Sequence, residues 1–297
     1  IGRDKKGITR LFLNNEPYFQ KGLLDQGYWC EGGLTAPTDE AMIFDISEMK
    51  RLGFNMLRKH IKVEPMRWYY HCDRLGMLVW QDMVSGGAYI GDFYAGVYKL
   101  KDNKYNRFSR GDKKWRRNYY EELEEMIKQL YSVTSIYCWV PFNEAWGQFD
   151  ALKVCDFVRN LDSHRVIDHA SGWYDQGGGD IDSMHKYILP IHLRKSKKRA
   201  FVVTEFGGYS NIVRGHTWNE KKAFGYLMFK SKESLTKAYK KLLDKQIIPI
   251  IDKGLSGTVY TQVSDVENEV NGIYTYDRAV LKIDENVLKD INSQLRY

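Results

Sequence analysis

The feature that most constrains the fold of this 297-residue chain is a regular alternation of short apolar runs with amphipathic segments. The apolar runs have the length and the β-branched or aromatic content of buried strands. We expect strands over residues 18–24, 54–58, 77–80, 136–140, 165–169, 182–185, 200–204 and 257–261. Eight strand–helix units in one chain of this length predict an α/β fold, a (β/α)8 TIM barrel.

The segments between these runs carry helix signals. Thr38, followed by two acidic residues, predicts a capped helix start, and Gly53 predicts the end of that helix. Pro65 is expected at the first position of the next helix. Further helices are expected over residues 112–131, 149–161, 219–246 and 285–295, and a long loop over residues 83–111. The stretch between the fifth and sixth strands is too short for a full helix.

Neither an internal repeat nor a low-complexity linker interrupts the chain, so residues 1–297 are predicted to form a single domain. An apolar run over residues 8–13 and a turn over residues 14–17 predict an N-terminal hairpin that caps this domain.

Charge and composition argue against several classes of function. The net charge of +7 is spread along the chain, without the clustered basic face or reading motif of a nucleic-acid binder. No apolar run is long enough to span a membrane. The four cysteines, predicted to be buried thiols, and the histidines lack zinc-ligand spacing. Residues 177–179 lack the lysine of a phosphate loop, so we expect neither a metal nor a cofactor.

Polar residues follow the predicted strands, and in a barrel such residues gather at one mouth. Two of them stand out: Glu144, just after the run 136–140, and Glu205, just after the run 200–204. Glu144 has tryptophan and phenylalanine neighbours, and burial among aromatic side chains raises the pKa of a carboxyl toward that of a general acid. One glutamate at a strand end is often structural, whereas two are harder to explain that way.

Strands four and seven lie on opposite sides of a barrel mouth, so Glu144 and Glu205 are predicted to face each other. Two carboxyls about 5–5.5 Å apart form the arrangement of retaining glycosidases, in which one attacks the anomeric carbon and the other transfers protons. Other strand-end side chains are expected to contact the substrate, whereas Trp139 is expected in the core. These candidates are Gln26, Trp29, Arg58, His60, Asp82, Asn143, Trp146, His185, Tyr187 and Gln262.

The chain resembles the catalytic barrel of glycoside hydrolase family 2, the group of β-galactosidases, β-glucuronidases and β-mannosidases. The Asn143-Glu144 pair and Glu205, followed by Phe206-Gly207-Gly208, resemble the wider clan of retaining barrel glycosidases. The narrower resemblance rests on motifs that occur in the family's order along nearly the whole chain, at residues 13–22, 53–60, 73–80, 182–187 and 271–278.

The resemblance implies that Glu144 is the acid/base and Glu205 the nucleophile. It implies that Asn143 bonds the sugar 2-hydroxyl, that Arg58 and His185 support the site, and that Tyr187 lies near the nucleophile. It also implies that β-sandwich domains precede the barrel in the parent protein. Residues 1–17 are then a hairpin or linker from those domains, which we expect to be absent here.

Departures from the family pattern leave the sugar open. Residues 25–29, 81–82 and 260–262 differ from those of many relatives at substrate-contact positions. Because the asparagine and lysine pattern of β-glucuronidases is not evident, the leading hypothesis is a retaining, exo-acting β-galactosidase. The alternatives are a β-glucuronidase or β-mannosidase of the same family, or a non-catalytic carbohydrate-binding barrel. The expected partner is an oligosaccharide or glycoside, with neither nucleic acid nor membrane, and no compartment is predicted.

Overall fold

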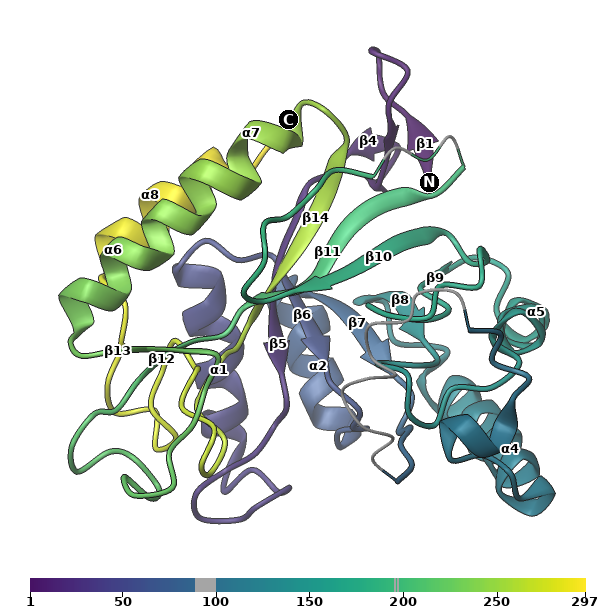
Figure 1. Ribbon diagram of the computed structural model, residues 1–297, viewed down its shortest axis with the longest axis horizontal. Helices are drawn as coiled ribbons and strands as arrows, with labels where there is room; N and C mark the ends of the chain where they lie inside the picture. Colours follow the sequence, from purple (N-terminus) through teal and green to yellow (C-terminus); the bar gives the residue numbers. More distant parts are fainter. Residues whose placement is uncertain (89–99, 195, 197) are drawn as a thin grey trace.

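Eight parallel strands form one curved sheet in the computed structural model, which describes residues 1–88, 100–194, 196 and 198–297 (Figure 1). The strands are β5 (Gln20–Asp25), β6 (Met56–Lys59), β7 (Leu78–Asp82), β8 (Ile136–Val140), β9 (Val166–Ile167), β10 (Ile181–Lys186), β11 (Ala200–Gly207) and β14 (Leu255–Thr261). Their order is β10-β11-β14-β5-β6-β7-β8-β9, so every neighbouring pair but one follows the chain around a barrel. The predicted (β/α)8 TIM barrel is confirmed.

The barrel has a seam between β9 and β10, which are the two ends of the strand order. Residues 168–180 join them without a helix, as expected from the short stretch in the sequence. Asp180 bridges the seam: its amide donates to Ile167 O at 2.8 Å, and its Oδ2 accepts from Ile167 N at 2.8 Å. One aspartate therefore supplies both a donor and an acceptor where a strand ladder is missing.

Helices cover the outside of the sheet (Figure 1). They are α1 (Asp39–Arg51), α2 (Met66–Leu75), α4 (Lys113–Leu130), α5 (Ala151–Leu161), α6 (Lys232–Leu242), α7 (Ile248–Ile251) and α8 (Glu285–Gln294), with a 3-10 turn at Tyr105–Phe108 and a π-helical turn at Leu243–Ile247. Thr38 caps α1 as predicted, and its side chain accepts from Ala41 N at 3.2 Å. Pro65 is the N-cap of α2 instead of its first residue. The expected loop 83–111 lies partly outside the described residues.

The expected helix over residues 219–246 is wrong in its first half. The helix α6 begins only after Ser231, which forms a capping box with Ser234. Upstream, β13 (Leu227–Phe229) pairs in parallel with β12 (Tyr209–Asn211). Gly225 explains part of this, since a Cβ there would lie 1.6 Å from Ser210 Oγ. The backbone at Gly225 therefore approaches Ser210 of β12 closely.

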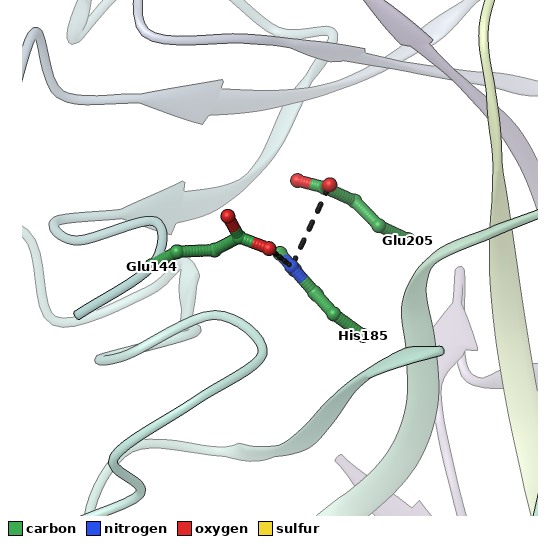
Figure 2. Close-up of side chains that lie close together, drawn as sticks. All are labelled: Glu144, His185 and Glu205. Atoms are coloured by element: carbon green, nitrogen blue, oxygen red, sulfur yellow. Dashed lines mark hydrogen bonds and ion pairs between the residues drawn. The ribbon is translucent and has the colours of Figure 1, made fainter. Parts of the chain in front are cut away.

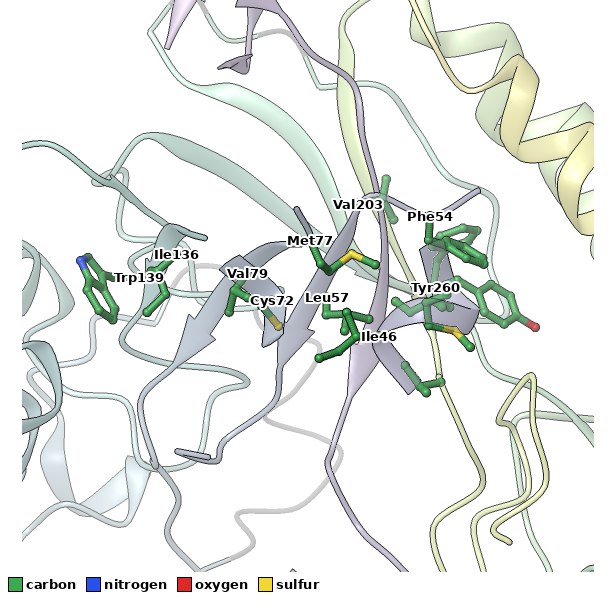
Figure 3. Packing of buried hydrophobic residues seen from close by; sticks show 14 of the residues in the cluster. Ile46, Phe54, Leu57, Cys72, Met77, Val79, Ile136, Trp139, Val203 and Tyr260 are labelled. Atoms are coloured by element: carbon green, nitrogen blue, oxygen red, sulfur yellow. The ribbon is translucent and has the colours of Figure 1, made fainter. Parts of the chain in front are cut away.

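The core has two layers. A large cluster, which includes Trp139, packs between the sheet and the helices (Figure 3). A smaller cluster, which includes Met56, Trp80 and Val259, fills the barrel interior. Trp139 is fully buried, as expected, and its Nε1 donates to Asp162 Oδ2 at 3.0 Å. Three of the four cysteines are buried thiols, whereas Cys30 is partly exposed.

Short antiparallel pairs precede the barrel. The strand β1 (Gly2–Arg3) pairs with β2 (Thr9–Arg10), and β3 (Phe12–Leu13) pairs with β4 (Glu16–Pro17). The expected single hairpin is therefore two short ones. In the part of the chain that the structure describes, no helix has the length and apolar character needed to cross a membrane.

Candidate active site

Glu144 and Glu205 converge at the carboxyl-terminal mouth of the barrel (Figure 2). Glu144 lies four residues beyond the end of β8, and Ala145 turns the chain sharply there with a φ of 31°. Glu205 lies within β11, opposite His185 of β10 in the sheet register. One oxygen of each carboxyl and one ring nitrogen of His185 all lie within 4.8 Å of one another. The two carboxyls that the sequence singled out thus face each other.

His185 lies between the two glutamates. Its Nδ1 is 2.6 Å from Glu144 Oε1 and 3.5 Å from Glu205 Oε2. Its Nε2 is 2.9 Å from Ser171 Oγ, on the loop after β9. Burial lowers the pKa of His185, the charge of Glu205 opposes this and that of Arg58 adds to it, and the net result is a pKa of about 3. The imidazole is therefore neutral at physiological pH.

Arg58 joins three strands at the centre of the site. Its Nε and Nη2 bond both oxygens of Asp82, at 2.9 and 3.0 Å. Its Nη1 donates to Glu205 Oε1 at 3.0 Å, and its Nη2 donates to Asn143 Oδ1 at 2.8 Å. Burial pushes the pKa of Asp82 upward, but Arg58 and His60 outweigh it and hold that pKa below 3.8. The structure thus brings three other predicted residues, Asp82, Asn143 and Glu205, around the guanidinium of Arg58.

The environment of Glu144 differs from that of Asp82. Burial raises the pKa of Glu144 to about 7, against the opposing charges of His60 and Arg58. Its side chain is 12% exposed. A carboxyl with this pKa is protonated in a large fraction of molecules near neutral pH, which is the state that a general acid needs.

Tyr187 contacts Glu205 from the other side. Its hydroxyl donates to Glu205 Oε2, and its ring stacks on Tyr226 with the centroids 3.8 Å apart and the planes 4° from parallel. Burial and the charge of Glu205 raise the pKa of Tyr187 well above 10, so the phenol stays protonated and remains a donor. Tyr226 precedes β13 and had no signal in the sequence that could pair it with Tyr187.

Gln26 and Gln262 meet beside the carboxylates. Gln26 Nε2 donates to Gln262 Oε1 at 2.8 Å and to Glu269 Oε2 at 3.3 Å, and Asn271 Nδ2 donates to Glu269 Oε1 at 2.9 Å. Burial raises the pKa of Glu269, and the charge of Glu205 adds to this. Glu269 is a further carboxylate, on a loop after β14, and it was not among the predicted residues.

A cavity of about 650 Å³ lies beside Gln26 and His60, lined also by Tyr28, Lys62 and Glu64, and neither Glu144 nor Glu205 is among its lining residues. Its size is that of a pocket for a small molecule.

Two tryptophans had been predicted to face a sugar, and they lie in different settings. Trp146 is half-buried and packs edge-on against Trp173, at 5.7 Å between centroids, and Trp173 in turn lies 6.4 Å from the His185 ring. Trp29 is 6% exposed, and Arg278 Cζ lies over its ring, 4.1 Å from the ring centroid. Trp29 therefore packs against the outer loops and has no contact with either glutamate among those recorded for the described residues.

Glu144, His185 and Glu205 are also spaced so that they could bind a metal ion. Each of their ligand atoms already has a protein partner, however, because His185 bonds Glu144 and Glu205 bonds Arg58 and Tyr187. The expectation that the site uses neither metal nor cofactor stays a prediction.

Comparison with known families and proteins gives matches along most of the chain. Residues 10–212 match the model of the glycosyl hydrolases family 2 TIM barrel domain. A β-galactosidase of Leuconostoc mesenteroides is 25% identical over 184 residues, which are 62% of this chain and 16% of that protein. A β-galactosidase of Vibrio vulnificus is 25% identical over 185 residues, with the same shares.

Solved structures share the fold at lower identity. A GH2 β-galacturonidase of Eisenbergiella tayi, bound to galacturonate, superposes with a TM-score of 0.73 at 19% identity, over 96% of this chain and 53% of that one. A β-D-glucuronidase of Dictyoglomus thermophilum gives a TM-score of 0.72 at 18% identity, over 94% and 51%. The chain thus spans about half of these solved structures and a smaller part of the curated relatives.

Proposed function

The chain belongs to glycosyl hydrolase family 2, and on that premise we propose that it hydrolyses β-glycosides with retention of anomeric configuration. The observation that carries this proposal is the pair Glu144 and Glu205, with oxygens within 4.8 Å of each other. This separation suits direct attack by a carboxylate, since enzymes that place a water between the two groups hold them about 6.5–9.5 Å apart.

In the first step, Glu205 attacks the anomeric carbon. The glycosidic carbon–oxygen bond breaks as the carboxyl of Glu144 gives its proton to the leaving oxygen. In the second step, the Glu144 carboxylate takes a proton from water, and the resulting hydroxide displaces Glu205 from the anomeric carbon. The ion pair with Arg58 and the hydrogen bond from Tyr187 orient the Glu205 carboxylate before attack.

We infer a β-galactoside as the substrate, supported by the curated relatives and by the lack of a β-glucuronidase pattern in the sequence. A β-uronide is the second candidate. It is favoured by two basic side chains that line the cavity, His60 and Lys62, although His60 Nδ1 already contacts Asp82 and Lys62 Nζ already pairs with Glu64. The two solved structures named above are a β-galacturonidase and a β-D-glucuronidase.

A panel of nitrophenyl β-glycosides would test the proposal, with the galactoside, glucuronide, galacturonide and mannoside compared at equal concentration. We expect turnover of the β-galactoside, and proton NMR of the first product should show the β-anomer. Glu205→Ala should abolish turnover and regain it with azide, giving an inverted glycosyl azide. Glu125→Ala, on the exposed face of α4, is the matched control and should keep full activity.

Saturable sugar binding without hydrolysis would instead support a non-catalytic barrel. A Glu205→Ala variant with near-normal activity would contradict the assignment of the nucleophile, and an α-anomer as first product would contradict retention.

A further inference from the structure

A line of hydroxyl groups runs from His185 to a main-chain carbonyl. Ser171 Oγ lies 2.9 Å from His185 Nε2 and 3.1 Å from Thr204 Oγ1. Thr204 Oγ1 lies 3.4 Å from the carbonyl oxygen of Met184. Ser171 and Thr204 are fully buried and were not predicted as site residues. Neither hydroxyl touches a carboxylate in these contacts, so both act on the site through His185.

The carbonyl at the end gives this line a direction. A carbonyl oxygen can only accept, so Thr204 donates to Met184 O, and Ser171 then donates to Thr204. The lone pair of Ser171 Oγ is left to accept from the imidazole, which requires a proton on Nε2 of His185.

Arg58 does not disturb this assignment. Its Nη1 lies 3.4 Å from His185 Nε2, but that nitrogen carries two hydrogens with better acceptors, Glu205 Oε1 at 3.0 Å and Thr204 O at 3.2 Å. The imidazole therefore need not accept from the guanidinium, and Nε2 is free to be a donor.

We propose that Ser171 and Thr204 are positioning residues that hold His185 as its Nε2–H tautomer, so that Nδ1 accepts the proton of Glu144. This inference rests on the proposed function. A carboxylate facing a nitrogen lone pair at 2.6 Å is disfavoured, whereas a protonated carboxyl donates a hydrogen bond there. The Nε2–H tautomer thus favours the protonated form of Glu144.

The surroundings of the ring support a fixed orientation. A Cβ on Gly172 would lie 2.3 Å from His185 Cγ, so the loop backbone packs directly against the imidazole. The charged and titratable groups that act on the ring are Glu144, Glu205, Arg58, His60 and Asp82, from both halves of the barrel. Burial and Arg58 keep the ring neutral, which the tautomer requires.

Nitrogen-15 NMR of histidine-labelled protein reads the tautomer directly, because protonated and unprotonated ring nitrogens have well-separated shifts. The chain has seven histidines, and His185→Gln would identify the signal. We expect the proton on Nε2 in the wild type and its transfer to Nδ1 in both Ser171→Ala and Thr204→Val. Ser171→Thr and Thr204→Ser keep the hydroxyls and should keep the wild-type tautomer.

The pH profile gives the functional readout. In Ser171→Ala, an Nδ1–H would stabilise the Glu144 carboxylate, and the alkaline limb of kcat/KM should move down by about one pH unit. The effect should be confined to substrates with poor leaving groups, and kcat/KM for a dinitrophenyl glycoside should stay within about twofold, since that leaving group needs no acid.

A proton on Nδ1 in the wild type would overturn the inference, as would an unchanged tautomer in both Ser171→Ala and Thr204→Val. These NMR results do not depend on turnover. A protein that hydrolyses no glycoside but shows the expected tautomers would therefore contradict the proposed function and leave the hydrogen-bond assignment standing.

Discussion

Arg58 shows how one side chain can set the geometry of a whole site. Its planar guanidinium bonds Asp82 through two parallel contacts and reaches Glu205 and Asn143 with its remaining hydrogens. A lysine carries the same charge but lacks this fixed fork. The side chain is fully buried, so any carboxylate that loses its partner stays out of water.

We therefore expect Arg58→Lys to destabilise the protein by about 3 kcal/mol, the low end for breaking a buried ion pair. The value of kcat/KM should fall at least about 100-fold, because Glu205 and Asn143 lose their common donor. Urea unfolding and steady-state kinetics measure the two effects. Arg67→Lys, which changes an exposed arginine of α2, is the control and should alter neither. A variant with wild-type stability would show that the fork is dispensable.

The raised pKa of Glu144 has a consequence for stability. Below a pH of about 4.5, the folded and unfolded chains both hold its proton; between 4.5 and about 7, only the folded chain keeps it. The free energy of unfolding must therefore fall as the pH rises through this window. The full cost, reached above pH 7, is about 3 kcal/mol, from 7 − 4.5 = 2.5 pH units at ~1.36 kcal/mol each.

Glu144→Gln should remove this cost, since an amide does not ionise and can still donate to His185 Nδ1. We expect the variant to be more stable than the wild type at pH 8, by up to about 3 kcal/mol, and equally stable near pH 4. Denaturant titrations at the two pH values would measure this, with Glu125→Gln as the exposed control. Equal stability at pH 8 would mean that Glu144 is ionised at little cost.

Sequence patterns located the two glutamates because each follows an apolar run, and strand polarity then places both at one mouth. The same logic placed Arg58, Asp82 and His185. It missed Ser171, Tyr226 and Glu269, which lie on loops where no period or cap reports which distant residue they will contact. Their contacts are with residues that are distant in the sequence and come close only in the folded chain.

At the scale of elements, the segment from β12 to β13 carries Tyr226 over the site. Tyr226 is 43% exposed, and its ring stacks flat on that of Tyr187, the donor to Glu205. Removing it would leave Tyr187 packed on one side only.

Tyr226→Ala should lower kcat/KM by about tenfold, the equivalent of a stacked aromatic pair worth up to ~1.5 kcal/mol. Tyr226→Phe should retain most of the activity, because the stack and not the hydroxyl is required. Phe224→Ala removes an exposed ring from the same segment and is the control. If Tyr226→Phe lost as much activity as Tyr226→Ala, the hydroxyl would be the functional group.

Elements with their own end signals were predicted well. Thr38 begins α1, and Asp112 caps α4 with its side chain accepting from Lys114 N. The region 219–231 was misread as helix because its lysines and aromatic residues resemble an amphipathic face. Residues 227–229 of this region instead pair with β12, which no local pattern reveals.

At the scale of the whole molecule, the barrel is closed by side-chain contacts at its seam. Asp180 Oδ2 accepts from both Ile167 N and Arg159, and its main-chain oxygen accepts from Ala200 N at 2.9 Å. The Asp180 contacts, together with the hydrogen bond from Ser183 Oγ of β10 to Asp168 Oδ2 after β9, link the two strands in place of a ladder.

Asp180→Ala should destabilise the protein by about 1–3 kcal/mol, because Ile167 N and Arg159 lose a partner. Hydrogen exchange should speed up at Ile167 more than at Val79 of β7, which is paired on both sides. Asp180→Asn keeps an acceptor oxygen, so its stability should lie between those of the wild type and Asp180→Ala. Uniform exchange rates in Asp180→Ala would show that the seam closes without this residue.

The seam also separates the two carboxyls. Glu144 follows β8 and Glu205 belongs to β11, so a path from one to the other through the seam crosses the Asp180 contacts, and the longer path runs around the rest of the barrel. Only about 1–1.5 Å distinguishes a gap that a carboxylate can close from one that admits a water. The distance between the two carboxyls therefore depends in part on the seam, where few hydrogen bonds join the strands. Substitutions at the seam between β9 and β10 would then alter which anomer is released, although they contact neither glutamate.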